Sequence, residues 1–442
     1  MTFLVGGLGQ ARDTLLCAAL RGAGLGVRQL PPPSDVGLRR ARALGNHGQC
    51  SPAHYAVGAV LQAADASGLS RSEFARTHQW VTVGSCGPCR LAAFPLEWAK
   101  VLRAEGLSGL GLELVDQLAF TAALGPRRLV RSAGMVVLAA LTAGDVLSAL
   151  ERSLRPWVCD PQALDAVLAN GVAELAAALE QGEGARATLA RVASRARALE
   201  LDPMRALPRV LLVGEPWTTL TDGDPSDGVV RRLEAVGAEV DVPRVVDWLR
   251  MLAWQRSVEL QEGPAERETC ARAVTGVSAL WRLLAGAAGV FEPLESPADL
   301  AALATPWYPP LIRGGSAHLE VARALSASQR RAVHLVLSVK PFGCLPSSAL
   351  SDGVLGPLLR KMPRAPAFAV LEANATGQAT VDSRLTLALE RATLAALDEF
   401  DEARAHRGLS LLQAQQVLSE LPITRLDGVR RYACSAAERL VR

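Results

Sequence analysis

Short apolar runs with the composition of buried strands recur along the chain, and segments with helical periodicity separate them. The expected strands are residues 3–5, 26–30 and 80–84 in a first region, and 209–215, 238–242, 333–339 and 367–371 in a second. Expected helices between them include residues 13–21, a helix from residue 51, residues 89–104 and residues 227–236. Parallel strands need long crossover connections, and helices of this length supply them. The pattern therefore predicts an α/β protein with two parallel-sheet, Rossmann-like lobes, a helical connector and a helical C-terminal tail.

Changes in composition divide the 442-residue chain into four parts. We expect residues 1–125 to form the first α/β lobe, residues 126–207 the helical connector, residues 208–400 the second lobe and residues 401–442 the helical tail. The connector is rich in alanine, leucine, arginine and glutamate at helical spacing. A chain of this length can bury a separate core in each of two or three domains.

Charge and hydropathy argue against several classes of function. The net charge is +3 and no long run of like charges occurs, which argues against nucleic-acid binding. The longest membrane-span candidate, residues 133–150, is interrupted by Asp145, so we expect no membrane span. The N-terminus lacks the basic start of a secretory signal. We expect a cytoplasmic protein whose eight cysteines stay reduced, which favours metal binding or redox chemistry over a disulfide framework.

Four of the cysteines lie in loops that contain glycine or proline. They are Cys50, just before the helix expected from residue 51; Cys86 and Cys89, in a Cys-Gly-Pro-Cys motif directly after strand 80–84; and Cys344, after strand 333–339. Ligands of parallel α/β folds gather in loops at the carboxyl ends of strands. A helix N-terminus favours the thiolate, and glycine lets backbone N–H groups approach the sulfur. We therefore expect these four cysteines to share one site.

The other four cysteines lie in helical or connector stretches without an adjacent glycine. They are Cys17, Cys159, Cys270 and Cys434, and we expect them to be small buried or incidental residues.

The residues alone leave three interpretations of the site open. The first is an iron–sulfur cluster on the four thiols. The second is a structural zinc in a non-catalytic scaffold, although zinc sites of this kind usually have two Cys-x-x-Cys pairs and here there is one. The third is a thiol–disulfide oxidoreductase, because Cys-Gly-Pro-Cys is also the thioredoxin tetrapeptide. That interpretation leaves Cys50 and Cys344 without a role, and Ser85 stands where thioredoxins have tryptophan.

With these motifs the chain resembles the 2-hydroxyacyl-CoA dehydratase and acyl-CoA dehydratase activase-related iron–sulfur proteins. The blocks that carry the resemblance are residues 45–52, 86–90, 213–215, 233–240, 341–346 and 382–385. These blocks span most of the chain in the order that the family has. One departure follows strand 367–371, where the family has acidic residues and a histidine and this chain has Glu372-Ala373-Asn374.

The resemblance implies a cluster, [4Fe-4S], between the two lobes, held by Cys50, Cys86, Cys89 and Cys344. Dehydratase-type members can leave one iron without a cysteine, so three or four of these residues would be ligands. The implied function is low-potential electron transfer in a dehydratase or an ATP-dependent reductase component. The implied electron donor is an ATP-hydrolysing activator of the actin-like superfamily, and the family is compatible with a homo- or heterodimer.

Several residues beside these loops are candidates for secondary roles. Arg90 could offset the charge of a cluster, hold an anionic substrate or be a surface arginine, and Glu215 lies at a strand end, where a helix N-terminus would also favour its charge. His47 and His54 flank Cys50, and we expect a loop histidine and a helix-surface histidine. We expect His334, at a strand start, to be structural.

The turn Gly6-Gly7-Leu8-Gly9 after the first strand resembles a phosphate-binding turn. It lacks the full spacing of a dinucleotide fingerprint, so we expect a plain strand-to-helix turn.

Overall fold

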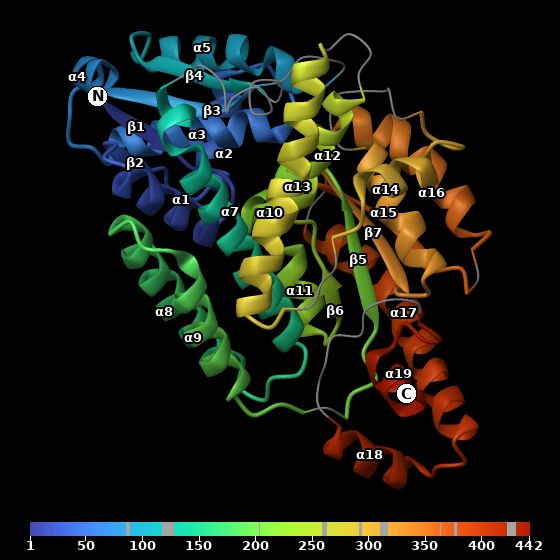
Figure 1. The fold of residues 1–442 in the computed structure, drawn as a ribbon. Coiled ribbons are helices and arrows are strands. Elements are labelled where there is room, and N and C mark those ends of the chain that lie inside the picture. The colour runs from blue at the N-terminus through green and yellow to red at the C-terminus, as the bar shows by residue number, and fades with distance from the viewer. Residues whose placement is uncertain are drawn as a thin grey trace.

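A computed structural model of the protein describes residues 1–84, 89–116, 128–202, 204–258, 263–290, 294–309, 317–362, 364–374, 378–421 and 430–442. Two four-stranded parallel sheets occupy separate parts of the molecule, and helices cover both of them (Figure 1). This architecture confirms the expected fold class, with two parallel-sheet lobes, connecting helices and C-terminal helices.

The sheet of the first lobe has the strand order β2-β1-β3-β4. Its strands are β1 (Thr2–Val5), β2 (Val27–Gln29), β3 (His78–Gly84) and β4 (Gly111–Asp116). Its helices are α1 (Gln10–Gly22), α2 (Asp35–Leu44), α3 (Ser51–Asp65), α4 (Arg71–Thr77), the 3-10 helix η1 (Arg90–Ala93) and α5 (Phe94–Ala104). Neighbouring residues of a strand point to opposite faces, so Leu4 packs with α3 and α5 while Val5 packs with α1.

Two elements of the first lobe differ from the expected pattern. The sequence does not indicate α2, because three of its ten residues are arginine and only Gly37, Leu38 and Ala41 are buried. The edge strand β4 was also not expected, because it is short and alternates apolar residues with Glu113, whose carboxylate accepts a hydrogen bond from Gln79 at 3.0 Å.

The sheet of the second lobe has the order β6-β5-β7-β8. Its strands are β5 (Arg209–Gly214), β6 (Glu239–Asp241), β7 (Leu335–Pro341) and β8 (Ala367–Ala373). Its helices are α10 (Pro216–Leu220), η2 (Asp224–Ser226), α11 (Val229–Ala235), α12 (Val245–Ser257), α13 (Pro264–Ala287), α14 (Pro297–Ala304), α15 (Ala317–Gln329), the π-helix η3 (Leu345–Ser351), α16 (Asp352–Leu359) and α17 (Gln378–His406). Every residue of β5 and β7 is buried.

Both sheets have the same topology. In each, the second strand lies beside the first at one side, and the third and fourth strands follow at the other side. The order in which strands are added to the sheet therefore reverses between the first and third strands. Parallel α/β folds bind their ligands at the carboxyl ends of the strands beside this point. Cys89 follows the third strand of the first sheet, and Cys344 follows the third strand of the second sheet.

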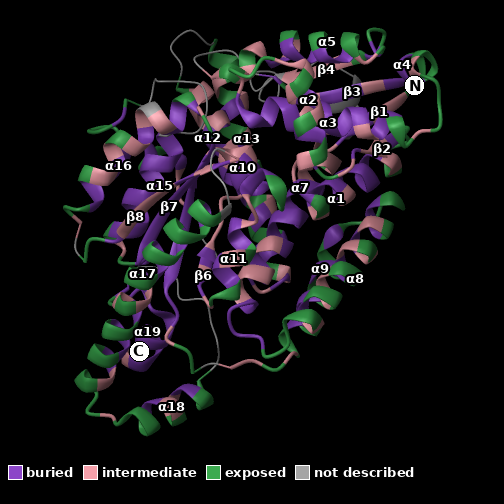
Figure 2. Cartoon of the chain, turned by 180° about the vertical axis from the view of Figure 1, so that it is seen from behind, coloured by how far each residue is buried: buried purple, intermediate pink, exposed green. Residues whose placement is uncertain are grey.

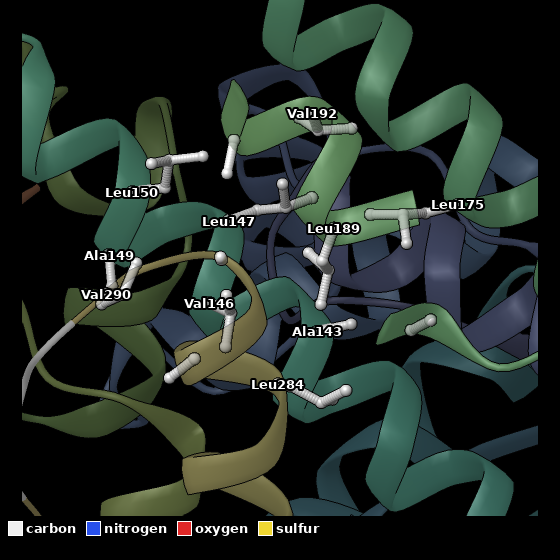
Figure 3. Close-up of a cluster of buried hydrophobic side chains, with 14 of the residues drawn as sticks. Ala143, Val146, Leu147, Ala149, Leu150, Leu175, Leu189, Val192, Leu284 and Val290 are labelled. Atoms are coloured by element: carbon white, nitrogen blue, oxygen red, sulfur yellow. The ribbon is translucent and has the colours of Figure 1, made fainter. Parts of the chain in front are cut away.

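Three helices join the lobes through a common apolar core. They are α7 (Arg128–Leu154), α8 (Pro161–Glu180) and α9 (Ala185–Arg197). Figure 3 shows Leu147 and Leu150 of α7 facing Leu189 of α9, with Leu284 of α13 below them. The same cluster contains Leu15 of α1, so one core holds a helix from each lobe. Arg12 of α1 adds a buried ion pair to Asp145 of α7 at 2.9 Å.

Two of these connecting helices are also long and apolar enough to span a membrane. Among the described residues they are Gly134–Leu154 and Pro161–Glu180, of which 56% and 28% are buried inside the fold. The apolar residues of both helices contribute to the shared core. Figure 2 shows α8 and α9 at one side of the molecule, with many exposed residues on both helices.

The C-terminal helices α18 (Leu411–Glu420) and α19 (Ser435–Val441) pack back onto α17. Because α17 continues to His406, the boundary expected at residue 400 lies inside this helix. The boundary expected at residue 125 lies outside the described residues.

The two lobes also meet directly through loops at the carboxyl ends of their strands. Thr221 Oγ1 donates a hydrogen bond to the Gly7 carbonyl at 3.3 Å, and Asp35 N–H donates to the Asp224 carboxylate at 2.8 Å. The cysteine loops therefore lie on the sides of the lobes that face each other.

Candidate functional site

Cys50 is the residue that caps the N-terminus of α3, where the chain leaves the loop after α2. The side chain is buried. Glu97 of α5 accepts the N–H of Asn46 in this loop, and Asn46 Oδ1 accepts the N–H of Gly48 at 2.9 Å. These contacts hold the loop against α5, and the expected helix start at residue 51 is confirmed.

The Cys-Gly-Pro-Cys motif follows β3, as the sequence predicts, but only its second cysteine is described. Residues 85–88, with Cys86 among them, lie outside the described residues. Cys89 caps the N-terminus of η1, and its carbonyl accepts the N–H of Ala92 at 3.2 Å. The helix expected over residues 89–104 is therefore two elements, the 3-10 helix η1 followed by α5.

Cys344 occupies the corresponding place in the second lobe, after β7. Gly343 has φ +73°, a left-handed conformation that favours glycine, and it turns the chain away from the strand. Cys344 then caps the N-terminus of the π-helix η3, and its carbonyl accepts the N–H of Ser348 at 2.9 Å. The side chain is buried. Single turns of π-helix occur frequently at functional sites.

Cys50 lies close enough to Cys344 and Cys89 for their charges to affect its ionisation. Burial raises the pKa of Cys50, and the negative charges of Glu215, Cys344 and Cys89 raise it further. Burial also raises the pKa of Cys344 to about 12, again with a contribution from Glu215. The pKa of Cys89 is raised for the same two reasons. Thiolates at this place would need a nearby positive charge to be stable.

Arg90 supplies one positive charge and contacts the loops of both lobes. Its Nη1 donates a hydrogen bond to the Gly48 carbonyl at 2.6 Å, beside Cys50. A Cβ atom added to Gly343 would lie 3.2 Å from the same Nη1. The guanidinium therefore lies between the two cysteine loops, where its charge opposes the rise in the pKa of Cys50 and Cys89.

Glu215 follows β5 and caps the N-terminus of α10. Its Oε1 accepts the N–H of Trp217 at 3.0 Å, and its Oε2 accepts the N–H and the hydroxyl of Thr218, both at 2.8 Å. Burial raises the pKa of this carboxyl. Of the two roles considered from the sequence, the structure has the one at a helix N-terminus, and the charge of the same carboxylate also raises the pKa of the three cysteines.

A buried polar network beside Cys344 was not predicted from the sequence. Lys340 at the end of β7 pairs with Asp352, and Glu320 of α15 accepts hydrogen bonds from Ser347 and Ser351 of η3. One sequence signal could have indicated it. Lys340 is one of very few lysines in the chain, and in the sequence it directly follows the expected buried strand 333–339.

The glycine turn after β1 is a plain strand-to-helix turn. The carboxylate of Asp13 accepts the N–H groups of Gly7 and Leu8 at 2.8 and 2.9 Å. A phosphate at this turn would need such N–H groups. Because a side chain of the same helix already occupies them, the turn does not offer a phosphate site.

The structure places the three histidines considered above, and also His318, in different surroundings. His47 is exposed in its loop, as expected. His54 was expected on a helix surface, and this prediction is wrong, because the residue is fully buried between α3 and the loop after α2. His334 is structural, since Nδ1 accepts the Arg209 N–H at 2.9 Å and Nε2 lies 3.1 Å from Glu399. His318 is buried, with its ring 5.8 Å from that of Tyr308.

The remaining cysteines lie away from this site. Cys17, Cys270 and Cys434 are buried and Cys159 is exposed. Cys17 belongs to the core between α1 and the first sheet, and Cys434 to the core between α17 and α19. Both are small core residues, as expected.

The donor set suits a thiophilic metal ion or cluster. Thiolate ligands from separate loops, helix N-termini and a nearby arginine are the surroundings that such a group needs. Within the described part of the chain, no group of three or more His, Cys, Asp or Glu side chains is arranged closely enough to hold a metal ion. Cys86 lies outside that part, so the full set of four thiols is not described.

Comparisons with known proteins add no family to this description. No protein-family model matches the chain, and no curated protein matches it.

Proposed function

We propose that the protein is an iron–sulfur electron-transfer protein of the type that its motifs resemble, with Cys50, Cys86, Cys89 and Cys344 as the candidate ligands of a [4Fe-4S] cluster. One observation carries the proposal. Cys50 and Cys89 of the first lobe and Cys344 of the second lobe all lie at helix N-termini, and Cys344 and Cys89 are close enough to Cys50 for their charges to raise its pKa.

The electrostatics of the site favour a cationic group among the thiols. Burial and the carboxylate of Glu215 both oppose ionisation of Cys50 and Cys344. Binding of a metal would displace the thiol protons and offset these charges. When bound, an iron–sulfur cluster would supply one-electron chemistry at low potential.

The protein's own residues would tune such a group in three ways. Ser347 offers a backbone hydrogen bond to the sulfur of Cys344, and Leu91 offers a backbone hydrogen bond to Cys89. Hydrogen bonds to cluster sulfur raise the reduction potential, and negative charge nearby lowers it. Arg90 contributes positive charge, and Glu215 contributes negative charge.

The surface next to Cys344 supports docking of an electron-donor protein. Phe342 and Leu345 flank Cys344 and Gly343, yet they are 61% and 43% exposed. These two exposed apolar side chains would give a partner protein an apolar contact beside the proposed cluster. The partner that the resemblance implies is an ATP-hydrolysing activator of the actin-like superfamily, in the cytoplasm. The electrons would serve a dehydration or a reduction.

The test is purification without oxygen, followed by iron, zinc and acid-labile sulfide analysis and an EPR spectrum of the reduced protein. We expect a brown protein with about four iron and four sulfide per chain and the EPR signal of a reduced cluster. A colourless protein with one zinc per chain would instead support the structural-scaffold interpretation. A metal-free protein whose Cys86 and Cys89 form a reversible disulfide would support the thiol–disulfide oxidoreductase.

A further inference from the structure

The segment that carries Cys344 is fastened at both of its ends by buried polar contacts. Lys340 begins it, at the end of β7, and forms an ion pair with Asp352, the first residue of α16. The Lys340 side chain is only 1% exposed, and its Nζ also donates a hydrogen bond to Ser338 Oγ at 3.2 Å. A buried ion pair that closes a short segment restricts the conformations of the residues between its partners.

Within this segment, Glu320 holds η3 from the inside of the lobe. Its Oε1 accepts a hydrogen bond from Ser347 Oγ at 2.8 Å, and its Oε2 accepts one from Ser351 Oγ at 2.6 Å. All three residues are buried. The two serines are four residues apart and lie on one side of η3, so a single carboxyl group holds both. Hydrogen bonds to a charged acceptor in a buried place are among the strongest in proteins.

Ser347 links this carboxyl to the sulfur of Cys344. Its hydroxyl lies within hydrogen-bonding reach of the Cys344 sulfur as well as of Glu320. A hydroxyl has one proton to donate and can accept at the same time. While Ser347 donates to Glu320, it can accept from the Cys344 thiol, so the three groups form a chain from α15 to the candidate site.

We propose that Glu320 is the positioning residue of Cys344. Through Ser347 and Ser351 it winds the chain after Cys344 into a π-helix and directs the sulfur toward the cysteines of the first lobe. The importance of that position for a cluster rests on the proposed function, but the contacts themselves belong to the metal-free chain. The proposal is therefore tested without metal.

The experiment measures alkylation of the reduced, metal-free, full-length protein with iodoacetamide, read residue by residue by mass spectrometry. In Glu320→Ala we expect Cys344 to react about tenfold faster or more, which is the change that corresponds to losing a hydrogen bond to a charged group. Ser351→Ala should act in the same direction with a smaller effect. Glu320→Gln keeps a carbonyl acceptor and should restore most of the protection.

The internal controls are Cys270 and Cys434, which are buried elsewhere in the chain. Their rates should stay within about twofold in these variants, because a local change leaves the rest of the fold closed. The matched variant is Glu399→Ala. Glu399 is also a buried glutamate of the second lobe, and it accepts the Cys434 N–H at 2.8 Å. Glu399→Ala should raise the alkylation rate of Cys434 and leave the alkylation rate of Cys344 unchanged.

The proposal is overturned if Glu320→Ala leaves the alkylation rate of Cys344 unchanged, or if it raises the alkylation rates of all buried cysteines equally. Should Glu320→Ala fail to fold, the comparison of Ser351→Ala with wild type decides the question by the same criteria. Failure of the proposed function is a separate outcome, because a chain without iron would still show or lack the selective protection of Cys344.

Discussion

Replacing Asp13 with asparagine should change how the stability of this protein depends on pH. Asp13 is 3% exposed and lies beneath the glycine turn of the first lobe. Burial raises the pKa of its carboxyl from 3.8 to about 6, and the N–H groups of Leu8 and Gly7 and the charge of Arg12 offset only part of that effect. The folded protein therefore holds this proton more tightly than the unfolded chain does.

The sign of the effect follows from this difference in proton affinity. The protonated carboxyl favours the folded state. Its stabilising contribution to the free energy of unfolding is therefore complete below pH 4 and is lost as the pH rises through about 6. At 1.36 kcal/mol per pKa unit, the change from 3.8 to about 6 corresponds to ~3 kcal/mol. This amount is a large part of the stability of an ordinary domain.

The assay is urea unfolding of wild type and Asp13→Asn at several values between about pH 4 and pH 8. The free energy of unfolding of wild type minus that of the variant should fall by ~3 kcal/mol between about pH 4 and pH 7 and then stay constant. A flat difference, or one that increases with pH, would refute the reasoning, because Asp13 would then be as ionised in the folded protein as in the unfolded chain.

The matched control is Asp165→Asn. Burial opposes ionisation of Asp165, but the hydrogen bond and charge of Arg155 hold the pKa of this carboxyl below its ordinary value. The contribution of the ionised Asp165 to the free energy of unfolding is therefore lost only as the pH falls below about 4. Between pH 4 and pH 7 the difference between wild type and this control should be flat.

Two further predictions concern the contact between the cysteine loops. Arg90→Ala removes the hydrogen bond to the Gly48 carbonyl, so a chelator should remove iron from this variant several-fold faster than from wild type, as measured by absorbance. Arg103→Ala, on the exposed side of α5, is the control and should not change the rate. Equal rates of iron removal in the two variants would contradict the role given to Arg90. Gly343→Ala should cost about 1–2 kcal/mol in urea unfolding because φ is +73°, plus a smaller amount for moving Arg90. Gly408→Ala, at φ +63° in open space, should show the backbone cost alone, and a larger loss for Gly408 than for Gly343 would contradict the contact.

The sequence predicts the lobes well because the signals are local. A mostly apolar run of the length of residues 333–339 is typical of a strand that is buried on both faces, and every residue of β7 is buried. The weaker elements α2 and β4 depend on tertiary packing. Only three of the ten residues of α2 are buried, and β4 is an edge strand that pairs with β3 alone among the described strands.

The site could be predicted only in part. Glycine and proline around Cys50, Cys89 and Cys344 indicate loops at helix starts, and the structure has all three there. The placement of Arg90 between the Gly48 and Gly343 loops depends on how two lobes pack, and no local pattern encodes that. The same holds for Glu320, which belongs to a helix that precedes β7 and yet holds the turn after it.

The central claim is that the cysteines of both lobes form one metal site, and Cys344→Ser tests it most directly. Iron and acid-labile sulfide per chain are measured in wild type, in Cys344→Ser and in Cys159→Ser, all purified without oxygen, with Cys159 chosen because it is exposed and away from the site. We expect wild type and Cys159→Ser to hold about four iron and four sulfide, and Cys344→Ser to lose most of both together with the chromophore. Full retention of iron and sulfide in Cys344→Ser would contradict a site shared by the two lobes.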